Sequence, residues 1–206
     1  MRVLPSGSTA ILVELDDLDE VLALYATLSQ NVPNGVLDLV PAARTLLLIT
    51  DPDVAALSSV EAAVRSAKPR SDLRDGGERV DIPVTYDGED LEEAAQLLGC
   101  DAAELVRRHT DAEWTVAFCG FIPGFGYLTS PVWTSEVPRR SSPRTKVPPG
   151  SVALAGEFSG VYPRQSPGGW QLIGRSELTM FDPARDPAAI LRPGVRVRFV
   201  DEDAGP

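Results

Sequence analysis

FCGFIPGFGYLTSPVWTSEVPRRSSPRTKVPPGSVALAGEFSGVYPRQSPGGW, residues 118–170, indicates the architecture of the larger part of this chain. Short apolar runs in and around this stretch alternate with turns that contain Gly and Pro. The expected strands are residues 114–121, 151–155, 160–162, 171–173, 178–180 and 195–200. Short strands at this spacing are typical of a closed or partly closed β-barrel. We therefore expect a β-barrel in the C-terminal part of the chain.

The N-terminal part carries a different pattern, in which strand-like and helix-like periods alternate. The expected elements are a strand at 9–15, a helix at 16–31, strands at 36–40 and 45–50, and a further strand at 78–85. A second helix is expected to begin at Asp51 and Pro52, because Asp is a good N-cap and Pro suits the first helical position. This order resembles a ferredoxin-like α/β sandwich, so the predicted fold class is α+β.

The polar stretch at 71–77 is the expected boundary between an N-terminal α+β domain (1–77) and a barrel domain (78–206). Two short helices are expected at the start of the second domain. Asp90 and Asp101 each stand three residues before a Glu, which is the spacing of a capping box. Both aspartates are therefore predicted to cap helices.

The charge of the chain excludes several classes of partner. Its formal net charge is -11 and its pI is about 4.5, which argues against nucleic acid and against an anionic membrane surface. No apolar run is long enough to span a bilayer, and the N-terminus lacks the pattern of a secretory signal. Cys100 and Cys119 fit no metal-ligand spacing and are expected to be buried thiols. We expect a soluble cytoplasmic protein with no metal site.

The first candidate site is the segment 120–127, in which glycines alternate with aromatic residues. Glycine lets a ligand approach the backbone closely, and aromatic rings supply a flat wall for a ring-shaped ligand. Gly124 and Tyr127 are the residues expected to shape such a pocket. The alternative is a tight loop that closes the barrel, with the aromatic rings filling its mouth.

The second candidate is the segment 138–144, where three arginines lie on a loop stiffened by proline. Arg139, Arg140 and Arg144 are suited to bidentate binding of a carboxylate or a phosphate. Because the basic run is confined to one loop, it favours a small anion over a polymer. The alternative is a solvated loop whose arginines pair with surface carboxylates.

The third candidate is the segment 162–171. Gly168 and Gly169 follow a proline in a turn whose exposed amides can hold an anion. Tyr162 and Gln171 add neutral donors and acceptors at the two ends of the segment. The alternative is a hairpin anchored in the core by Trp170.

His109 is the only histidine, so any histidine-based catalysis must use it. It stands near the end of an expected helix, where a cationic side chain can also act as a cap. The sequence contains no phosphate-binding loop, no dinucleotide fingerprint and no nucleophile elbow. Because no complete catalytic set is present, we expect another chain to complete the site if this protein is an enzyme.

Five blocks in order resemble the family that contains allophanate hydrolase subunit 1, the B-type subunit of 5-oxoprolinase and the sporulation kinase inhibitor. The blocks are residues 120–128, 138–144, 147–152, 159–163 and 166–170. Two departures from the family pattern stand out. Gly126 replaces the usual Pro, and Phe158-Ser159 replaces Gln-Thr.

The resemblance implies an N-terminal α/β domain, a C-terminal cyclophilin-like β-barrel, and a homologous second subunit that shares the active site. In the 5-oxoprolinase system the pair works with a third, lactam-binding subunit and hydrolyses ATP to open 5-oxoproline to glutamate. ATP is thus the implied cofactor, bound with or by the partner subunit. The residues expected to act are Arg139, Arg140 and Arg144 on an anion, His109 and Gln171 in catalysis, and Gly124, Tyr127, Tyr162, Gly168 and Gly169 around the ligand.

We therefore put first a subunit of an ATP-dependent lactam hydrolase, corresponding to the B-type subunit of 5-oxoprolinase. Allophanate hydrolase subunit 1 is the related alternative, although this chain has no amidase-type Ser/Lys motif. A non-enzymatic inhibitor of a histidine kinase is the alternative from another class, with the barrel as the docking surface. A peptide binder of the prolyl-isomerase kind rests on fold analogy alone.

Overall fold

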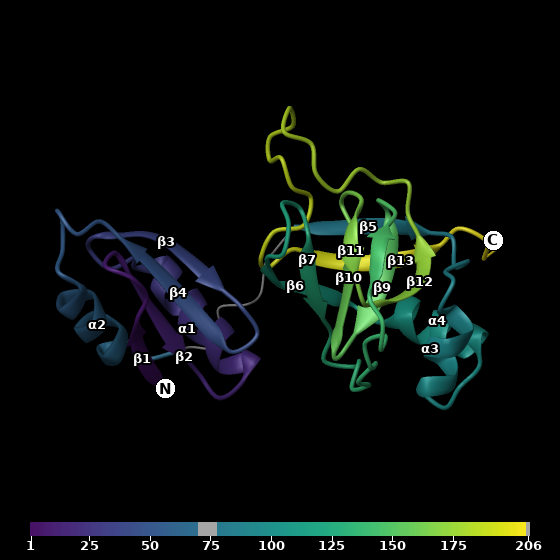
Figure 1. Cartoon of the computed structure of the whole chain (residues 1–206), viewed down its shortest axis with the longest axis horizontal. Helices are drawn as coiled ribbons and strands as arrows, with labels where there is room; N and C mark the ends of the chain where they lie inside the picture. The colour runs from purple at the N-terminus through teal and green to yellow at the C-terminus, as the bar shows by residue number, and fades with distance from the viewer. Residues whose placement is uncertain (70–77, 205–206) are drawn as a thin grey trace. The chain divides into compact units, whose positions relative to one another are not determined.

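The computed structural model describes residues 1–69 and 78–204, and the chain divides into two units, Met1–Gly76 and Gly77–Pro206. Figure 1 shows both units along the chain. The expected domain boundary at 71–77 lies outside the described residues. Each unit has its own buried core, so each is described by itself.

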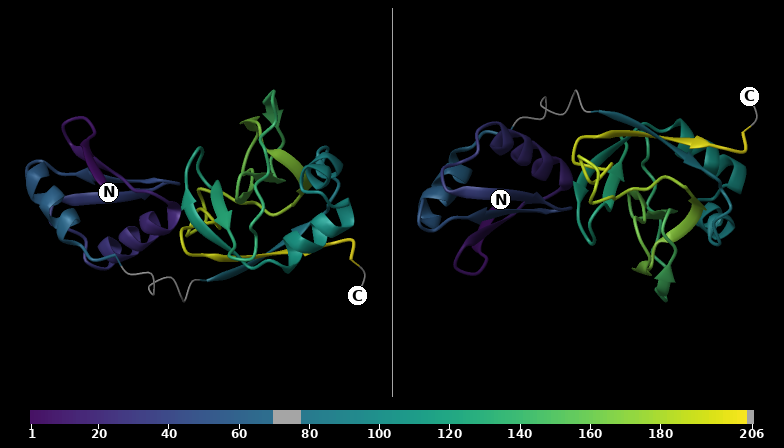
Figure 2. Two further views of the ribbon diagram at one scale, coloured as in Figure 1. Left: turned by 90° about the horizontal axis from the view of Figure 1, so that it is seen from below. Right: turned by 90° about the horizontal axis from the view of Figure 1, so that it is seen from above.

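The N-terminal unit is a four-stranded antiparallel sheet with two helices. Its elements are β1 (Arg2–Pro5), β2 (Ala10–Glu14), α1 (Leu18–Gln30), β3 (Val36–Pro41), β4 (Thr45–Thr50) and α2 (Leu57–Ser66). The strand order is β1-β2-β4-β3. Alternate residues of the central strands, such as Val13 and Leu48, point to one face and are fully buried there against Leu24 and Val60 from the helices. Both helices therefore cover the same face of the sheet (Figure 2).

Two details of this unit differ from the prediction. In a ferredoxin-like sheet the last strand of the chain lies at one edge. Here β1, a strand that was not predicted, occupies that edge beside β2. The second helix begins at Leu57 and not at Asp51. Asp51 instead accepts a hydrogen bond from the Asp53 N–H in a single turn, and Ala56 is extended before the helix starts.

The C-terminal unit contains a seven-stranded sheet that is nearly closed. Its elements are β5 (Arg79–Val84), α3 (Leu91–Leu97), α4 (Ala102–Asp111), β6 (Trp114–Cys119), β7 (Gly126–Thr129), β8 (Arg144–Val147), β9 (Ser151–Ala155), β10 (Phe158–Val161), β11 (Ser166–Gly168), β12 (Gln171–Arg175) and β13 (Arg196–Asp201). The strand order is β12-β9-β10-β7-β6-β13-β5. A bridge between Thr85 and Arg175 joins the two ends of the sheet. The predicted fold class, a ferredoxin-like sandwich followed by a cyclophilin-like barrel, is confirmed.

The barrel sheet is buried on both faces at β9. Val152 and Leu154 point into the main core of the barrel, whereas Ala153 and Ala155 point into a second, smaller core. The second core lies under the two-stranded ribbon formed by β8 and β11. This ribbon carries the arginine loop and the Pro-Gly-Gly turn, so the small core positions two of the three candidate segments.

Several expectations for this unit need correction. Residues 178–180 do not form a strand, and the short strands β7, β8 and β11 were not predicted. Cys100 and Cys119 are free thiols that are half-buried rather than buried. Burial raises the pKa of Cys119 to about 11, so its thiol stays protonated at neutral pH.

Among the described residues, no helix has the length and apolar character that a membrane-spanning segment requires. No group of three or more His, Cys, Asp and Glu side chains in 1–69 and 78–204 has the arrangement of a metal site.

Candidate functional site

Asp90, at the start of α3, holds the arginine loop in place. Its carboxylate is 3% exposed and accepts hydrogen bonds from Arg140 Nη1 at 2.5 Å and from Arg144 Nη2 at 2.7 Å. Its other oxygen accepts the Leu172 backbone N–H at 2.7 Å. Asp90 makes no side-chain bond to its own helix, so the predicted capping role is wrong. Its contact with strand β12 and the loop explains the difference.

The charges of this cluster stabilise one another. Burial alone would raise the pKa of Asp90, but the hydrogen bonds from Arg144 and Leu172 and the two positive charges hold it below its ordinary value. The bond to Asp90 likewise raises the pKa of Arg144, with help from Glu89 at 3.1 Å. Asp90 and Arg144 are therefore both charged at neutral pH, and their ion pair fastens the loop to the barrel.

Arg139 differs from its two neighbours. Arg140 and Arg144 are occupied by carboxylates, which corrects the expectation that all three arginines bind an external anion. Arg139 is exposed, and no carboxylate in the described part of the chain forms an ion pair with it. It is the member of the trio whose charge is free for a ligand.

Two tyrosines lie near the Arg139 guanidinium. Burial raises the pKa of Tyr127 and of Tyr162, and the positive charge of Arg139 acts against both shifts. Tyr127 is half-buried, whereas Tyr162 is 2% exposed and lies in the small core. The loop that carries Arg139 also approaches Tyr162 through the ribbon, because the Gly169 carbonyl accepts the Arg140 N–H at 2.8 Å and Gly168 packs against the Tyr162 hydroxyl.

Aromatic rings form a continuous cluster beneath this group. Tyr127 stacks on Phe118 with ring centroids 4.4 Å apart, and Phe125 meets Tyr162 and Trp170 edge to face at 5.2 and 5.3 Å. The predicted alternative for the third segment, a turn anchored by Trp170, also holds, because Trp170 is 5% exposed. We name the group of Phe121, Tyr127, Arg139 and Tyr162 the aromatic–arginine site.

The predicted glycines shape the loops around this site. Gly124 has φ 86, and a Cβ there would lie 2.5 Å from Phe181 Cβ. A Cβ on Gly168 would lie 2.3 Å from the Tyr162 hydroxyl, which shows how closely the ribbon approaches the ring. Gly169 accepts the Arg140 N–H through its carbonyl at 2.8 Å. These glycines permit close packing at the site.

Gln171 and His109 are both buried, so neither can contact a ligand at the surface. Gln171 is 1% exposed and donates from Nε2 to the Pro138 carbonyl at 3.2 Å, so it ties the arginine loop to β12. His109 is fully buried in the barrel, with Nδ1 2.7 Å from the Tyr86 hydroxyl and Nε2 2.8 Å from Ser159 Oγ. A ligand at the surface cannot reach His109, contrary to its predicted catalytic role.

The buried position of His109 predicts a pH dependence of stability. Burial lowers the pKa of His109 to about 3 from an unfolded value near 6.5. Below pH 6.5 His109 is protonated in the unfolded chain but stays neutral in the folded chain. The free energy of unfolding therefore falls as the pH falls. We expect His109 to account for a loss of about 2 kcal/mol between pH 7 and pH 5. Denaturant unfolding of wild type and His109→Gln at both pH values measures this, and equal losses in the two proteins would contradict it.

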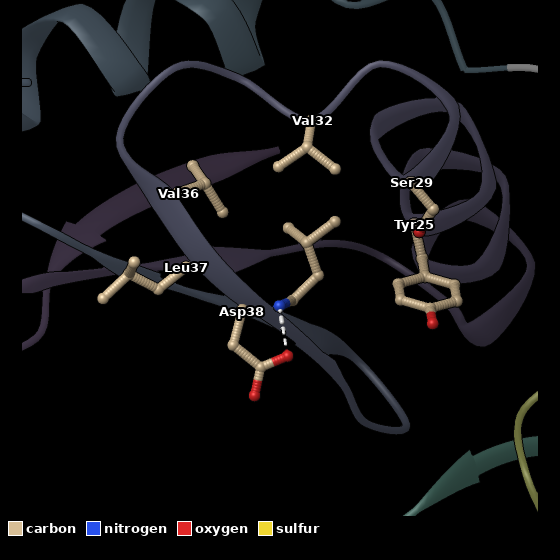
Figure 3. A pocket seen from close by; sticks show the side chains of 7 residues that line it. Tyr25, Ser29, Val32, Val36, Leu37 and Asp38 are labelled. Atoms are coloured by element: carbon tan, nitrogen blue, oxygen red, sulfur yellow. Dashed lines mark hydrogen bonds between the residues drawn. The ribbon is translucent and has the colours of Figure 1, made fainter.

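A separate hollow of about 220 Å³ lies in the N-terminal unit between α1 and β3 (Figure 3). Its walls include Tyr25, Val32 and Leu37, and its charged residue is Asp38, whose carboxylate accepts the Leu39 N–H at 2.8 Å. None of the predicted site residues lines this hollow. It therefore gives no support to the chemistry expected from the arginine and aromatic segments.

Two residues of this region had no predicted role in the site: Asp90 was expected only as a helix cap, and Phe121 was one of the aromatic residues of the segment 120–127. Asp90 is separated from its arginine partners by 50 and 54 positions, so no local pattern reveals the contact. Phe121 is 56% exposed beside two glycine-rich turns, and its backbone conformation was not readable from residue type. The aromatic–arginine site offers one cation, the half-buried Tyr127 and the exposed ring of Phe121, whereas the Tyr162 hydroxyl is covered by the ribbon. This set suits a small anion with an apolar body.

Comparisons with known proteins agree with this fold along most of the chain. The family described as the carboxyltransferase domain, subdomain C and D, matches residues 1–191. The B-type subunit of 5-oxoprolinase from Escherichia coli O157:H7 is 37% identical over 208 residues, which cover 97% of this chain and 95% of that protein.

Two solved structures extend the comparison. The crystal structure of TTHA0988 is 35% identical with a TM-score of 0.76, and the match covers 96% of this chain and 40% of that one. The urea amidolyase of K. lactis is 16% identical with a TM-score of 0.74, covering 97% of this chain and 14% of that one. The chain thus spans less than half of both structures, and the second likeness shows the fold alone.

Proposed function

The chain belongs to the carboxyltransferase domain, subdomain C and D, family, and we propose that it is one subunit of an ATP-dependent hydrolase that opens the lactam of 5-oxoproline. The observation that carries the proposal is the exposed Arg139, which has no carboxylate partner among the described residues and stands on a loop that the Arg140–Gly169 hydrogen bond holds beside Tyr162. 5-Oxoproline is a five-membered lactam with a planar amide and one carboxylate, and the site offers one guanidinium and a ring surface. The similarity to the B-type subunit of 5-oxoprolinase over nearly the whole length supports this assignment.

In this proposal Arg139 binds the substrate carboxylate, because a guanidinium and a carboxylate form charge-assisted hydrogen bonds. Tyr127 lies beside it and borders the ligand with its half-buried hydroxyl. Asp90 acts through Arg140 and Arg144, since it fixes the loop from which Arg139 projects. Asp90 and Gln171 are therefore positioning residues.

The aromatic–arginine site contains no carboxylate or histidine to act as a general base. We infer that a homologous second subunit supplies the missing groups and completes the site. ATP would bind with or on that subunit, and a third subunit would deliver the lactam. Hydrolysis of ATP would supply the free energy that opening the stable five-membered amide requires.

The experiment that tests the proposal compares substrates in the assembled complex. The chain is co-expressed with its homologous partner subunit, combined with the third component, and assayed with ATP and either 5-oxoproline or allophanate. We expect ATP-dependent formation of glutamate from 5-oxoproline. Consumption of allophanate without turnover of 5-oxoproline would replace this assignment by the allophanate hydrolase alternative.

A further inference from the structure

Phe121 is a large apolar side chain that the fold leaves in solvent. Its ring is 56% exposed, although it belongs to a barrel whose other phenylalanines are buried or half-buried. Its φ is 67, and it is the single non-glycine residue with positive φ among residues 1–69 and 78–204. A bulky side chain rarely adopts this region, because its Cβ crowds the backbone. The loop therefore holds an exposed ring at a conformational cost.

The backbone around Phe121 is fixed by three hydrogen bonds. Gly120 N–H donates to the Phe125 carbonyl at 3.2 Å, Ile122 N–H to the Gly120 carbonyl at 2.8 Å, and Phe125 N–H to the Ile122 carbonyl at 3.1 Å. Phe125 is 1% exposed and anchors the far side of the loop in the small core. A glycine at position 121 would suit this backbone better. The backbone conformation thus gives no reason for a phenylalanine there.

The surroundings of Phe121 point to a ligand. Its ring meets Phe125 edge to face at 5.7 Å and Tyr162 edge to face at 6.4 Å. Tyr162 in turn lies against the ribbon that holds the arginine loop: a Cβ on Gly168 would lie 2.3 Å from the Tyr162 hydroxyl, and the Gly169 carbonyl accepts the Arg140 N–H at 2.8 Å. The Tyr162 ring therefore lies between the strained, exposed phenylalanine and the loop that carries Arg139.

We propose that Phe121 is a specificity-determining residue whose ring packs against the planar amide of the substrate's lactam ring while Arg139 holds the carboxylate. This inference rests on the proposed function and adds the group that recognises the ring. The planar amide of the lactam can lie flat on an aromatic face. The site should therefore prefer 5-oxoproline to cyclopentanecarboxylate, which carries the same carboxylate on an uncharged five-membered ring but lacks the planar amide.

The test uses Phe121→Gly in the assembled complex, with Val132→Ala as the matched control, because Val132 is an exposed apolar residue of the same unit. We expect Phe121→Gly to raise the KM for 5-oxoproline about tenfold, which is the upper range for one aromatic contact. The melting temperature of the chain should change little, since relief of the strained backbone offsets the loss of the ring contacts with Phe125 and Tyr162. Val132→Ala should change neither quantity.

Inhibition by cyclopentanecarboxylate separates recognition of the amide ring from carboxylate binding. In wild type, 5-oxoproline should bind more tightly than cyclopentanecarboxylate, and Phe121→Gly should remove most of this preference. Arg139→Ala should weaken both ligands alike. An unchanged KM and preference in Phe121→Gly, with normal wild-type turnover, would overturn this inference and leave the proposed function standing.

Two other outcomes also overturn it. If Phe121→Gly prevents assembly with the partner subunit, as judged by size-exclusion chromatography, Phe121 is a subunit contact and not a ligand contact. If the wild-type complex does not turn over 5-oxoproline at all, the proposed function fails and this inference fails with it.

Discussion

Replacement of Asp90 by Ala is expected to lower the free energy of unfolding of the C-terminal unit by about 3 kcal/mol. The carboxylate is 3% exposed, and its removal leaves the guanidinium groups of Arg140 and Arg144 without their shared partner. The Leu172 N–H also loses its acceptor. Breaking a buried pair from one side is costly because the remaining charges stay desolvated.

Denaturant unfolding followed by tryptophan fluorescence measures this loss selectively. All three tryptophans, Trp114, Trp133 and Trp170, belong to the C-terminal unit, so the signal reports that unit. Asp87→Ala is the matched control, because the ion pair of Asp87 with Arg175 is largely exposed and is expected to contribute less than about 1 kcal/mol. Equal losses in the two variants would contradict a buried clamp at Asp90.

Replacement of Arg139 by Ala is expected to raise the KM for 5-oxoproline by about 10-fold to 100-fold in the assembled complex. This range corresponds to the loss of about 1.5–3 kcal/mol from a charge-assisted hydrogen bond. Stability should hardly change, because Arg139 is exposed and has no carboxylate partner in the described part of the chain. The KM of Arg139→Lys should lie between that of wild type and that of Arg139→Ala, since lysine keeps the charge but loses the bidentate geometry.

Arg164→Ala supplies the control for Arg139. Arg164 is also exposed and lies just before the ribbon strand β11, so its removal changes the local charge by the same amount. Steady-state kinetics with 5-oxoproline should show a normal KM for this variant. Normal kinetics in Arg139→Ala as well would return Arg139 to the alternative of a solvated loop.

Local sequence signals predicted those elements whose bounds are set by neighbouring turn and capping residues. The run Ser151–Ala155 lies between two glycines and is the strand β9 with those bounds, and Asp101 caps α4 through the Glu104 N–H at 2.7 Å. β7 was missed because it is four residues long and begins at Gly126, which has low strand propensity. The second helix was placed too early because Asp51 makes a single turn that Ala56 interrupts.

The chemistry of the arginine loop could be predicted in kind but not in detail. Three arginines in one loop indicated carboxylate binding, and the structure shows that two of them bind a carboxylate of the same chain. Only the tertiary fold places Asp90 against them, because β12 brings the Leu172 N–H to the other carboxylate oxygen. His109 was expected to be catalytic because it is the only histidine in the sequence. Its hydrogen-bond partners Tyr86 and Ser159 come from distant parts of the sequence, so its burial between them could not be predicted.

The omission experiment tests the central claim most directly. Glutamate formation from 5-oxoproline and ATP is measured with the partner subunit and the third component, first without this chain and then after adding it back. We predict no turnover without the chain and full turnover at a stoichiometric amount of it. Equal turnover with and without the chain, or none in either case, would contradict its role as a subunit of this hydrolase.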